Sequence, residues 1–537
     1  MAPMFRRILV ANRGEIAARV LRACRALGIR TVAVHSTVDA ASPHLELADE
    51  TVCIGGPRPR ESYLNAEAIL QAAEQTHSQA IHPGYGFLAE NALFAERCAA
   101  HRITFIGPPA GAIRTMGDKV EARRAMKAAG IPVIPGSDGA LASVDEAARV
   151  AARAGYPVMI KAVAGGGGRG MRRCKDEEGL RSAFPEAAAE AGAAFGNPAL
   201  YLEKFIDGGR HIEFQILADG YGSAIHLAER ECSIQRHHQK LIEEAPSPVI
   251  GAVTRAELGA TVASAAARIG YTGAGTMEFL RDPKGSLHFM EMNTRLQVEH
   301  PVTEEITGID IVREQIRIAA GERLSIAQED VRLSGHAIEC RINAEDPSDG
   351  FRPAPGTLRA FAFPETGARG TRLRLDTHVK AGYTVPPFYD SMVAKVIVHG
   401  PDRPSAIRAM IAALRAATIE GIPTTVPFQL RVLEDGEFAD GSYDVGTVAR
   451  LLASDDIRGP GADRAGSSPA ASGTRSTSAA SGDRSSPRVP AASGGGSAPA
   501  TSGARRSSKS SAASTSSGKS KGSAAAAPAR SRSKAKG

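Results

Sequence analysis

Residues 276–293 read TMEFLRDPKGSLHFMEMN, in which two apolar runs flank the turn sequence Asp282-Pro283-Lys284-Gly285. A turn of this kind between apolar runs predicts an antiparallel β-hairpin. If the hairpin centres on Lys284-Gly285, Glu278 and Glu291 lie at equal distances from the turn and face each other across the two strands. Like charges directly opposite each other destabilise a strand pair, so we expect a cation between them.

Glu278, Glu291 and Asn293 are candidate ligands of a magnesium or manganese ion. Mg²⁺ accepts such carboxylates together with nucleotide phosphates. Asn293 lies two residues beyond Glu291, on the same face of the strand, and could add a neutral oxygen. The alternative is a pair of solvated surface glutamates. The apolar neighbours, among them Met277 and Phe289, favour a buried strand pair and therefore the metal site.

A glycine run follows another predicted strand. The strand ends at Lys161, and Gly165, Gly166, Gly167 and Gly168 precede Arg169. Consecutive glycines let the backbone approach a ligand closely, and their N–H groups can line a phosphate. A flexible hairpin loop is the alternative, but the flanking Lys and Arg favour phosphate binding.

Polar side chains are also dense in two further segments, residues 293–301 and 232–240. In residues 293–301, Arg295, Gln297 and Glu299 alternate, so an extended chain would place them on one face. Arg and Gln could hold a small oxyanion and Glu could take a proton from it; an exposed polar loop is the alternative. In residues 232–240, the adjacent histidines lack metal-ligand spacing and suggest phosphate donors, while Cys232 is expected to be a plain buried thiol.

The order of elements predicts an α/β fold. The first 110 residues alternate strand and helix signals, which predicts a doubly wound parallel sheet, although no GxGxxG motif follows the first strand. One long helix is expected over 110–129, and a smaller α/β unit over 144–206. From residue 211 onward, hairpin signals predict antiparallel strands.

Charge is divided unevenly along the 537 residues. The segment 458–537 holds 14 Lys and Arg against 2 Asp, which leaves 51 basic and 56 acidic residues in 1–457. This Ser/Ala/Lys/Arg-rich tail is expected to be disordered, because it has too little apolar surface to offset its ordering entropy. The chain has no apolar run near the ~18 residues of a spanning helix, and its six dispersed cysteines suggest reduced thiols and a cytoplasmic location.

These blocks, in this order, resemble biotin carboxylases of the ATP-grasp superfamily. The resemblance covers about residues 4–450 and rests on ILVANRGEIAARV, HPGYGFLAEN, GGGGRGM, ERECSIQRHHQK, EMNTRLQVEHPVTE and ECRINAEDP. It implies five segments: an N-terminal domain (1–113), a linker helix and ATP-grasp lid (114–203), an ATP-grasp catalytic domain (204–334), a C-terminal domain with a barrel-like subdomain (335–457), and the tail (458–537).

The resemblance also implies a role for each matching residue. ATP would be bound by Lys119, Lys161, Gly165, Gly166, Gly167, Gly168, Glu203, Lys204, Ile206, His211, Gln235 and His238. The metal ligands would be Glu278, Glu291 and Asn293. Bicarbonate would be bound by Lys240, Arg295, Gln297 and Val298. Glu299 would be the general base and Arg341 the residue that stabilises the biotin enolate. Lys240, Arg295, Glu299 and Arg341 would form the catalytic group.

The implied reaction is ATP-dependent carboxylation of biotin by bicarbonate, through carboxyphosphate. Because no Met-Lys-Met sequence is present, biotin is expected on a separate carrier protein, with carboxyltransferase subunits as further partners and a homodimer as the assembly. Acetyl-CoA carboxylase is the expected context, and another acyl-CoA or pyruvate carboxylase is the alternative. The nearest rival is another ATP-grasp carboxylate ligase with a different acceptor, and the EMNTRLQVEHP block weighs against it. A nucleic-acid-associated protein that acts through the tail would belong to a different class, although the tail lacks aromatic residues to stack on bases.

Overall fold

A five-stranded parallel sheet forms the N-terminal part of the structure, a computed structural model that describes residues 4–164 and 171–454. Its strands, in sheet order, are β3 (Glu50–Cys53), β2 (Arg30–His35), β1 (Arg7–Val10), β4 (Ala80–His82) and β5 (Thr104–Phe105). Its helices are α1 (Gly14–Ala26), α2 (Ala66–Gln75) and α3 (Ala92–Ala100). The chain moves outward from β1 to β3 and then returns to β4 beside β1, which confirms the predicted doubly wound sheet. In such sheets, the carboxyl ends of β1 and β4 are where ligands bind.

The predicted single helix over 110–129 is wrong, because the chain forms two helices, α4 (Ala110–Gly117) and α5 (Lys119–Ala128). Asp118 separates them in an extended conformation, and its carboxylate accepts hydrogen bonds from the backbone N–H groups of Val120 and Glu121. This N-cap satisfies free donors of the second helix. The break also makes Lys119 the first residue of α5.

A small antiparallel sheet follows, in the order β7-β6-β8. Its strands are β6 (Val158–Ala162), β7 (Met171–Cys174) and β8 (Leu200–Lys204), and its helices are α6 (Val144–Ala154) and α7 (Glu177–Phe195). Along β6, Val158, Ile160 and Ala162 are buried against the helices. Because strand side chains alternate, Lys161 faces the opposite side of the sheet. The predicted glycine loop, Gly165 to Gly168, lies outside the described residues, as does the tail at 458–537.

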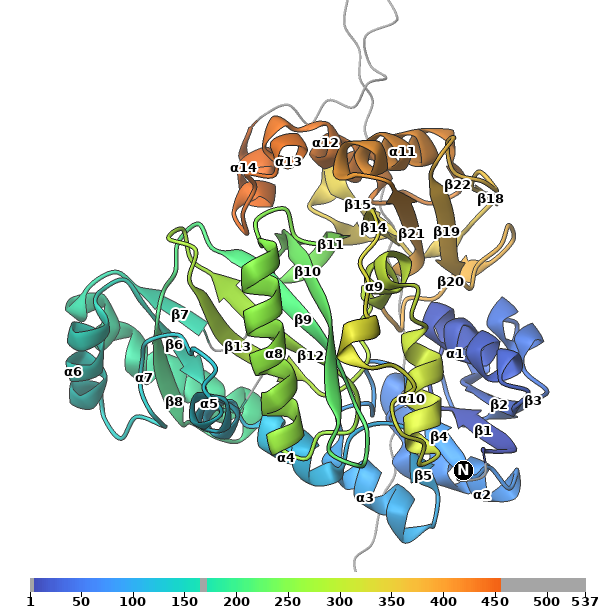
Figure 1. The fold of residues 1–537 in the computed structure, drawn as a ribbon, viewed down its shortest axis with the longest axis horizontal. Helices are drawn as coiled ribbons and strands as arrows, with labels where there is room; N and C mark the ends of the chain where they lie inside the picture. The colour runs from blue at the N-terminus through green and yellow to red at the C-terminus, as the bar shows by residue number, and fades with distance from the viewer. Residues whose placement is uncertain (1–3, 165–170, 455–537) are drawn as a thin grey trace, which may run out of the picture. The chain divides into compact units, whose positions relative to one another are not determined.

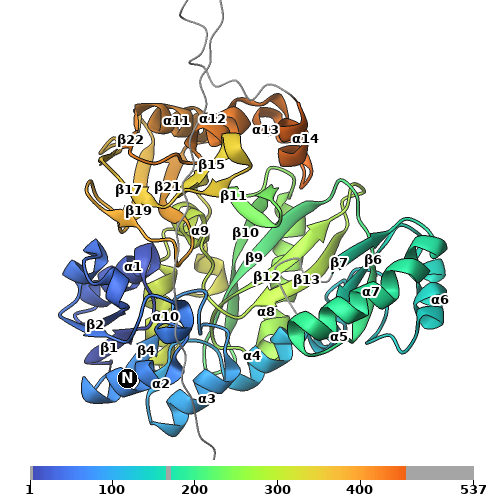
Figure 2. The ribbon, with the colours of Figure 1, turned by 180° about the vertical axis from the view of Figure 1, so that it is seen from behind.

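An eight-stranded antiparallel sheet forms the centre of the structure (Figures 1 and 2). In order, its strands are β13 (Leu287–Asn293), β12 (Gly273–Arg281), β9 (Arg210–Ala218), β10 (Ala224–Arg236), β11 (Gln239–Ala245), β14 (His336–Asn343), β21 (Met392–Gly400) and β19 (Arg372–Thr377). Helix α8 (Ala252–Arg268) packs on β9 and β10, whose apolar side chains form one core with it. The pairing of β11 with β14 joins the C-terminal strands to this sheet.

Short strand pairs and helices complete the C-terminal part. The pairs are β15 (Glu345–Asp346) with β16 (Arg352–Pro353), β17 (Gly356–Thr357) with β20 (Thr384–Val385), and β18 (Ala360–Ala362) with β22 (Thr418–Glu420). The helices are α11 (Arg403–Ala416), α12 (Val426–Glu434), α13 (Gly436–Asp440) and α14 (Thr447–Ala453). Helix α9 (His300–Thr307) packs on β14, while α10 (Ile311–Ala319) packs on β12. In residues 4–164 and 171–454, no helix has the length and apolar character that crossing a membrane requires.

Candidate active site

A cavity of about 1310 Å³ is lined by residues that follow β1 and β4 of the parallel sheet, and by residues of the small sheet and of the central sheet with its C-terminal strands. It brings together most of the residues predicted from the sequence. These are Lys119, Lys161, Lys204, Ile206, His211, Gln235, His238, Lys240, Glu278, Glu291, Asn293, Arg295, Gln297, Val298, Glu299 and Arg341. Glu203 is the predicted residue in the described part of the chain that does not line the cavity; it lies behind Lys161, with their carboxylate and ammonium 2.5 Å apart.

The predicted pairing of Glu278 with Glu291 is confirmed. The register is regular from Thr276 to Glu278, and Met290 is then the extra residue of a β-bulge. Each carboxylate has an ammonium group beside it: the Nζ of Lys119 donates to Glu291 at 2.8 Å, and that of Lys240 donates to Glu278 at 3.1 Å.

The oxygen atoms on this hairpin suit a hard divalent cation. Asn293 lies next to the paired glutamates, and its Nδ2 donates to Glu278 at 2.9 Å. Its Oδ1 accepts a hydrogen bond from Arg295 at 3.0 Å. Two carboxylates and an amide oxygen are ligands that Mg²⁺ prefers. The lysines that now balance the carboxylates could turn to phosphate oxygens when a cation takes their place.

Glu299 lies between two cations in the cavity. Its Oε1 accepts a hydrogen bond from the Nζ of Lys240 at 2.5 Å, and its Oε2 accepts one from Nη2 of Arg341 at 2.9 Å. The side chain is fully buried. A carboxylate in this position can receive a proton from an anion that the same two cations attract.

The prediction that Arg295, Gln297 and Glu299 lie on one face of an extended chain is wrong. Residues 294–299 instead form bends and a turn that leads into α9. Proline at the second position of α9 suits a helix start. The side chains nevertheless converge: Nη1 of Arg295 donates to Oε1 of Gln297 at 2.9 Å, and Nε of Arg295 donates to Glu90 at 2.8 Å.

The adjacent histidines form the turn between β10 and β11. His237 and His238 have φ values of 49° and 67°, the left-handed conformation that a two-residue hairpin loop requires at both positions. His238 lines the cavity. Burial and the nearby charge of Lys161 lower the pKa of His238, so its imidazole is neutral at physiological pH and suited to hydrogen bonding.

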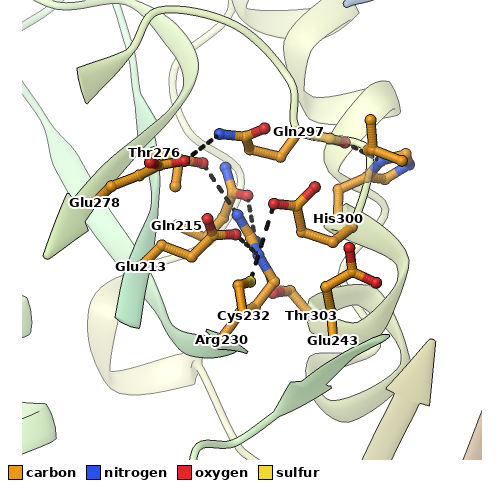
Figure 3. Close-up of polar contacts among 12 residues, drawn as sticks. Glu213, Gln215, Arg230, Cys232, Glu243, Thr276, Glu278, Gln297, His300 and Thr303 are labelled. Atoms are coloured by element: carbon orange, nitrogen blue, oxygen red, sulfur yellow. Dashed lines mark hydrogen bonds and ion pairs between the residues drawn. The ribbon is translucent and has the colours of Figure 1, made fainter. Parts of the chain in front are cut away.

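Sequence reasoning missed the buried groups that support Lys240 (Figure 3). Glu213 on β9 accepts hydrogen bonds from Lys240 at 2.6 Å and from Arg230 at 2.5 Å. Arg230 is fully buried and also donates to Gln215, Thr276 and Thr303. The signal that could have found Glu213 was its spacing from His211, since residues two apart on a strand share a face.

The electrostatics of this cluster favour charged side chains. Burial opposes ionisation of Lys240, but the carboxylates of Glu213, Glu278 and Glu299 outweigh it and raise the Lys240 pKa. Burial likewise disfavours an ionised Glu278, yet Lys240 and His211 lower its pKa. Cys232 is a buried thiol, as predicted, and burial raises its pKa well above the ordinary value.

Comparison with known proteins places almost the whole described chain in one family. The family model for the biotin carboxylase N-terminal domain matches residues 4–113. The model for the carbamoyl-phosphate synthase L chain ATP-binding domain matches residues 118–327, and that for the biotin carboxylase C-terminal domain matches residues 339–450.

Individual relatives are similar over nearly their full length. Biotin carboxylase of Nostoc sp. is 56% identical over 447 residues, which are 83% of this chain and 99% of that protein. Biotin carboxylase of Pseudomonas aeruginosa is 54% identical over 453 residues, 84% of this chain and 100% of the relative.

Solved structures agree with this. The biotin carboxylase domain dimer of Hydrogenobacter thermophilus 2-oxoglutarate carboxylase, in complex with MgADP, ADP and bicarbonate, has a TM-score of 0.80 and 51% identity, covering 83% of this chain and 98% of that one. Biotin carboxylase from Campylobacter jejuni, in a β-γ-ATP complex, has a TM-score of 0.80 and 48% identity. The match covers 83% of this chain and 99% of that one. With its domain matches, its fold and the paired carboxylates of its cavity in agreement, the chain belongs to the biotin carboxylase family of ATP-dependent carboxylases.

Proposed function

We propose that the chain uses ATP and bicarbonate to carboxylate biotin on a separate carrier protein, the first half-reaction of acetyl-CoA carboxylase. The observation that carries this proposal is the position of Glu299. Its carboxylate lies between Lys240 and Arg341 in the same cavity as the Glu278–Glu291 pair. One cavity therefore combines a base, an anion pocket and a cation site.

The first step is proton removal from bicarbonate. Lys240, Arg295, Gln297 and Val298 hold the anion, and Glu299 accepts its proton while the bicarbonate oxygen attacks the γ-phosphate of ATP. Carboxyphosphate forms and ADP leaves. Lys119 and Lys161 contact the phosphates and offset their charge. Mg²⁺ or Mn²⁺ at Glu278, Glu291 and Asn293 supplies further neutralisation of the phosphate oxygens when bound.

The adenine is assigned to the segment of Glu203, Lys204 and Ile206, of which Lys204 and Ile206 line the cavity. His211, Gln235 and His238 would line the nucleotide pocket, with Gly165 to Gly168 over the phosphates. The Nζ of Lys204 donates to the backbone carbonyls of Gly155 and Tyr156 at 2.9 and 2.8 Å. We infer that Lys204 shapes this pocket by fixing the loop before β6.

The second step transfers the carboxyl group. Carboxyphosphate breaks down to carbon dioxide and phosphate, and the phosphate takes the N1 proton of biotin. Arg341 donates to the ureido oxygen as negative charge develops on it, and N1 then attacks carbon dioxide. A closed cavity limits the competing hydrolysis of carboxyphosphate.

The organisation around this reaction is also a proposal. The domains would be 1–113, 114–203, 204–334 and 335–457. The family-model matches at 4–113 and 339–450 support the first and last of them, and a single match at 118–327 spans the middle two. The partners would be a biotin carboxyl carrier protein, carboxyltransferase subunits and a second copy of this chain, in the cytoplasm. The dimer named for the Hydrogenobacter relative supports the second copy.

The test measures phosphate release by the purified full chain. We expect ATP cleavage that requires bicarbonate and Mg²⁺ and increases with free biotin. A rate that is independent of bicarbonate and unaffected by biotin would contradict the proposal and favour a ligase with another acceptor. Nucleic acid that co-purifies and is released by salt would favour the tail-mediated function.

A further inference from the structure

Two buried glutamates lie behind Arg341, outside the cavity. Glu243 on β11 and Glu339 on β14 are directly paired residues of neighbouring strands. Both are fully buried, and neither lines the cavity. In the described part of the chain, all four of their carboxylate oxygens lack a hydrogen-bond partner. Two buried carboxylates opposite each other, neither of them hydrogen-bonded, are costly when both are ionised.

Glu243 and Glu299 hold Arg341 at two different nitrogens. Oε1 of Glu243 lies 2.5 Å from Nε, a close ion pair without the alignment of a hydrogen bond. Oε2 of Glu299 lies 2.9 Å from Nη2. Nη1 of Arg341 makes no hydrogen bond to the described residues, and Arg341 lines the cavity. Nη1 is therefore available to a ligand.

The two carboxylates cannot hold Arg341 equally throughout the reaction. When Glu299 accepts a proton, its attraction for the guanidinium weakens, because a neutral carboxyl group binds a cation less strongly than a carboxylate does. Glu243 lies behind the guanidinium and out of contact with the cavity. It can thus retain Arg341 while Glu299 is protonated.

Building on the proposed function, we propose that Glu243 is a positioning residue that keeps Arg341 directed at biotin after Glu299 is protonated, and that Glu339 holds a proton so that the pair carries a single negative charge. Two close carboxylates in a buried site do not ionise together. Burial raises the pKa of Glu339 well above its ordinary value. Burial outweighs the charge of Arg341 at Glu243 and raises its pKa to about 7.

Several charged or titratable groups surround Glu243. They are Lys240 on its own strand, Cys232 on β10, Glu339, Cys340 and Arg341 on β14, and Glu299 just before α9. Burial raises the pKa of the Cys232 thiol and of the Cys340 thiol well above the ordinary value. Both are neutral near pH 7, so ionisation of Glu243 is the change expected to affect Arg341 there.

The experiment measures carboxybiotin formed per phosphate released, with free biotin and the full chain, from pH 6 to 8.5. The wild-type ratio should rise with a midpoint near pH 7, as Glu243 ionises. Glu243→Gln should lower the ratio by about tenfold or more, the scale of a displaced catalytic group, and remove its pH dependence. The KM for ATP should stay unchanged. Glu339→Gln, the neutral isostere of a protonated carboxyl group, should keep the midpoint.

Glu231→Gln is the matched control, because Glu231 is a buried glutamate on β10 that contacts Ser233, Ser247 and Arg210 outside the cavity. It should lower thermal stability without lowering the ratio. A wild-type ratio that is constant with pH would overturn the proposal, even if Glu243→Gln fails to fold. Equal losses of phosphate and carboxybiotin in Glu243→Gln would do so too. A wild-type enzyme that forms no carboxybiotin would instead contradict the proposed function.

Discussion

Glu278 on β12 and Glu291 on β13 are paired directly across the hairpin, yet each carboxylate accepts a hydrogen bond from a different lysine. Lys119 reaches Glu291 from the start of α5, and Lys240 reaches Glu278 from β11. The repulsion expected between the glutamates is thus offset without a metal ion. Both lysines line the cavity, so a cation and a nucleotide can exchange partners with them.

We predict that Glu291→Gln raises the Mg²⁺ concentration needed for half-maximal ATP cleavage by at least about tenfold. Loss of a residue that only hydrogen-bonds to a metal ligand already lowers metal affinity by about that much, and Glu291 is assigned as a ligand itself. The metal-free melting temperature should change little, because the Glu291 side chain is 43% exposed and such ion pairs contribute about 0–1 kcal/mol. Glu121→Gln, on the exposed side of α5, is the control. Normal Mg²⁺ dependence with a large loss of stability would make Glu291 structural.

Glu299→Gln should slow bicarbonate-dependent ATP cleavage by roughly 10²–10⁴-fold, because glutamine keeps the shape but cannot accept the proton. Phosphate release at saturating bicarbonate is the measurement. Glu305→Gln on α9, the helix that begins after Glu299, is the control, because Glu305 pairs with Arg372 away from the cavity. A loss below tenfold would exclude Glu299 as the base.

Arg341→Ala should separate the two halves of the reaction. It leaves Arg295, Gln297 and Val298 in place but removes the cation that meets charge on the biotin oxygen. ATP cleavage should persist in part while most carboxybiotin is lost. Phosphate and carboxybiotin are measured in the same reaction. Proportional losses of both products would show that Arg341 serves both steps.

Glu244 should control the acid stability of the C-terminal part. It accepts hydrogen bonds from His336 at 2.5 Å and from Arg403 at 2.7 Å. Burial alone would raise its pKa, but these two partners lower it to about 2. Because the folded-state pKa is depressed, the stabilisation is present above about pH 4.5 and is lost as the pH falls toward 2. Its size is about 3 kcal/mol.

The measurement for Glu244 is the melting temperature of the wild type and of Glu244→Gln between pH 7 and pH 3. The variant should melt lower at pH 7 and show a shallower decline in acid. Parallel curves for the two proteins would exclude Glu244 as a source of the pH dependence.

Deletion of 458–537 should leave kcat and KM for free biotin nearly unchanged at physiological salt. The segment holds 14 basic and 2 acidic residues, and its charge is screened beyond a Debye length of about 8 Å. The steady-state constants of the full and shortened chains are the comparison. A steep loss with free biotin would contradict this, whereas a change seen with the protein carrier alone would indicate electrostatic docking.

The sequence by itself determined the elements whose contacts are local. The turn sequence predicted the hairpin that carries Glu278 and Glu291. The register next to the turn would by itself pair Glu278 with Met290, and the β-bulge at Met290 is what brings Glu291 opposite Glu278. The alternation of strands and helices in the first 110 residues predicted the parallel sheet, because a helix between two strands lets the second strand run parallel to the first. The prediction of one helix over 110–129 failed at Asp118. The helical pattern continues through this residue, but its carboxylate caps a new helix, and apolar periodicity does not reveal a cap.

The tertiary structure alone decided which distant groups meet. Arg341 and Glu299 are 42 residues apart, and they touch because β14 joins the central sheet beside β11 while α9 packs across these strands. The same arrangement places Glu243 behind Arg341 and Glu213 beneath Lys240. No periodicity encodes these contacts, since they depend on strand order. Buried ion pairs of this kind form only where neighbouring elements supply the opposite charge and exclude water.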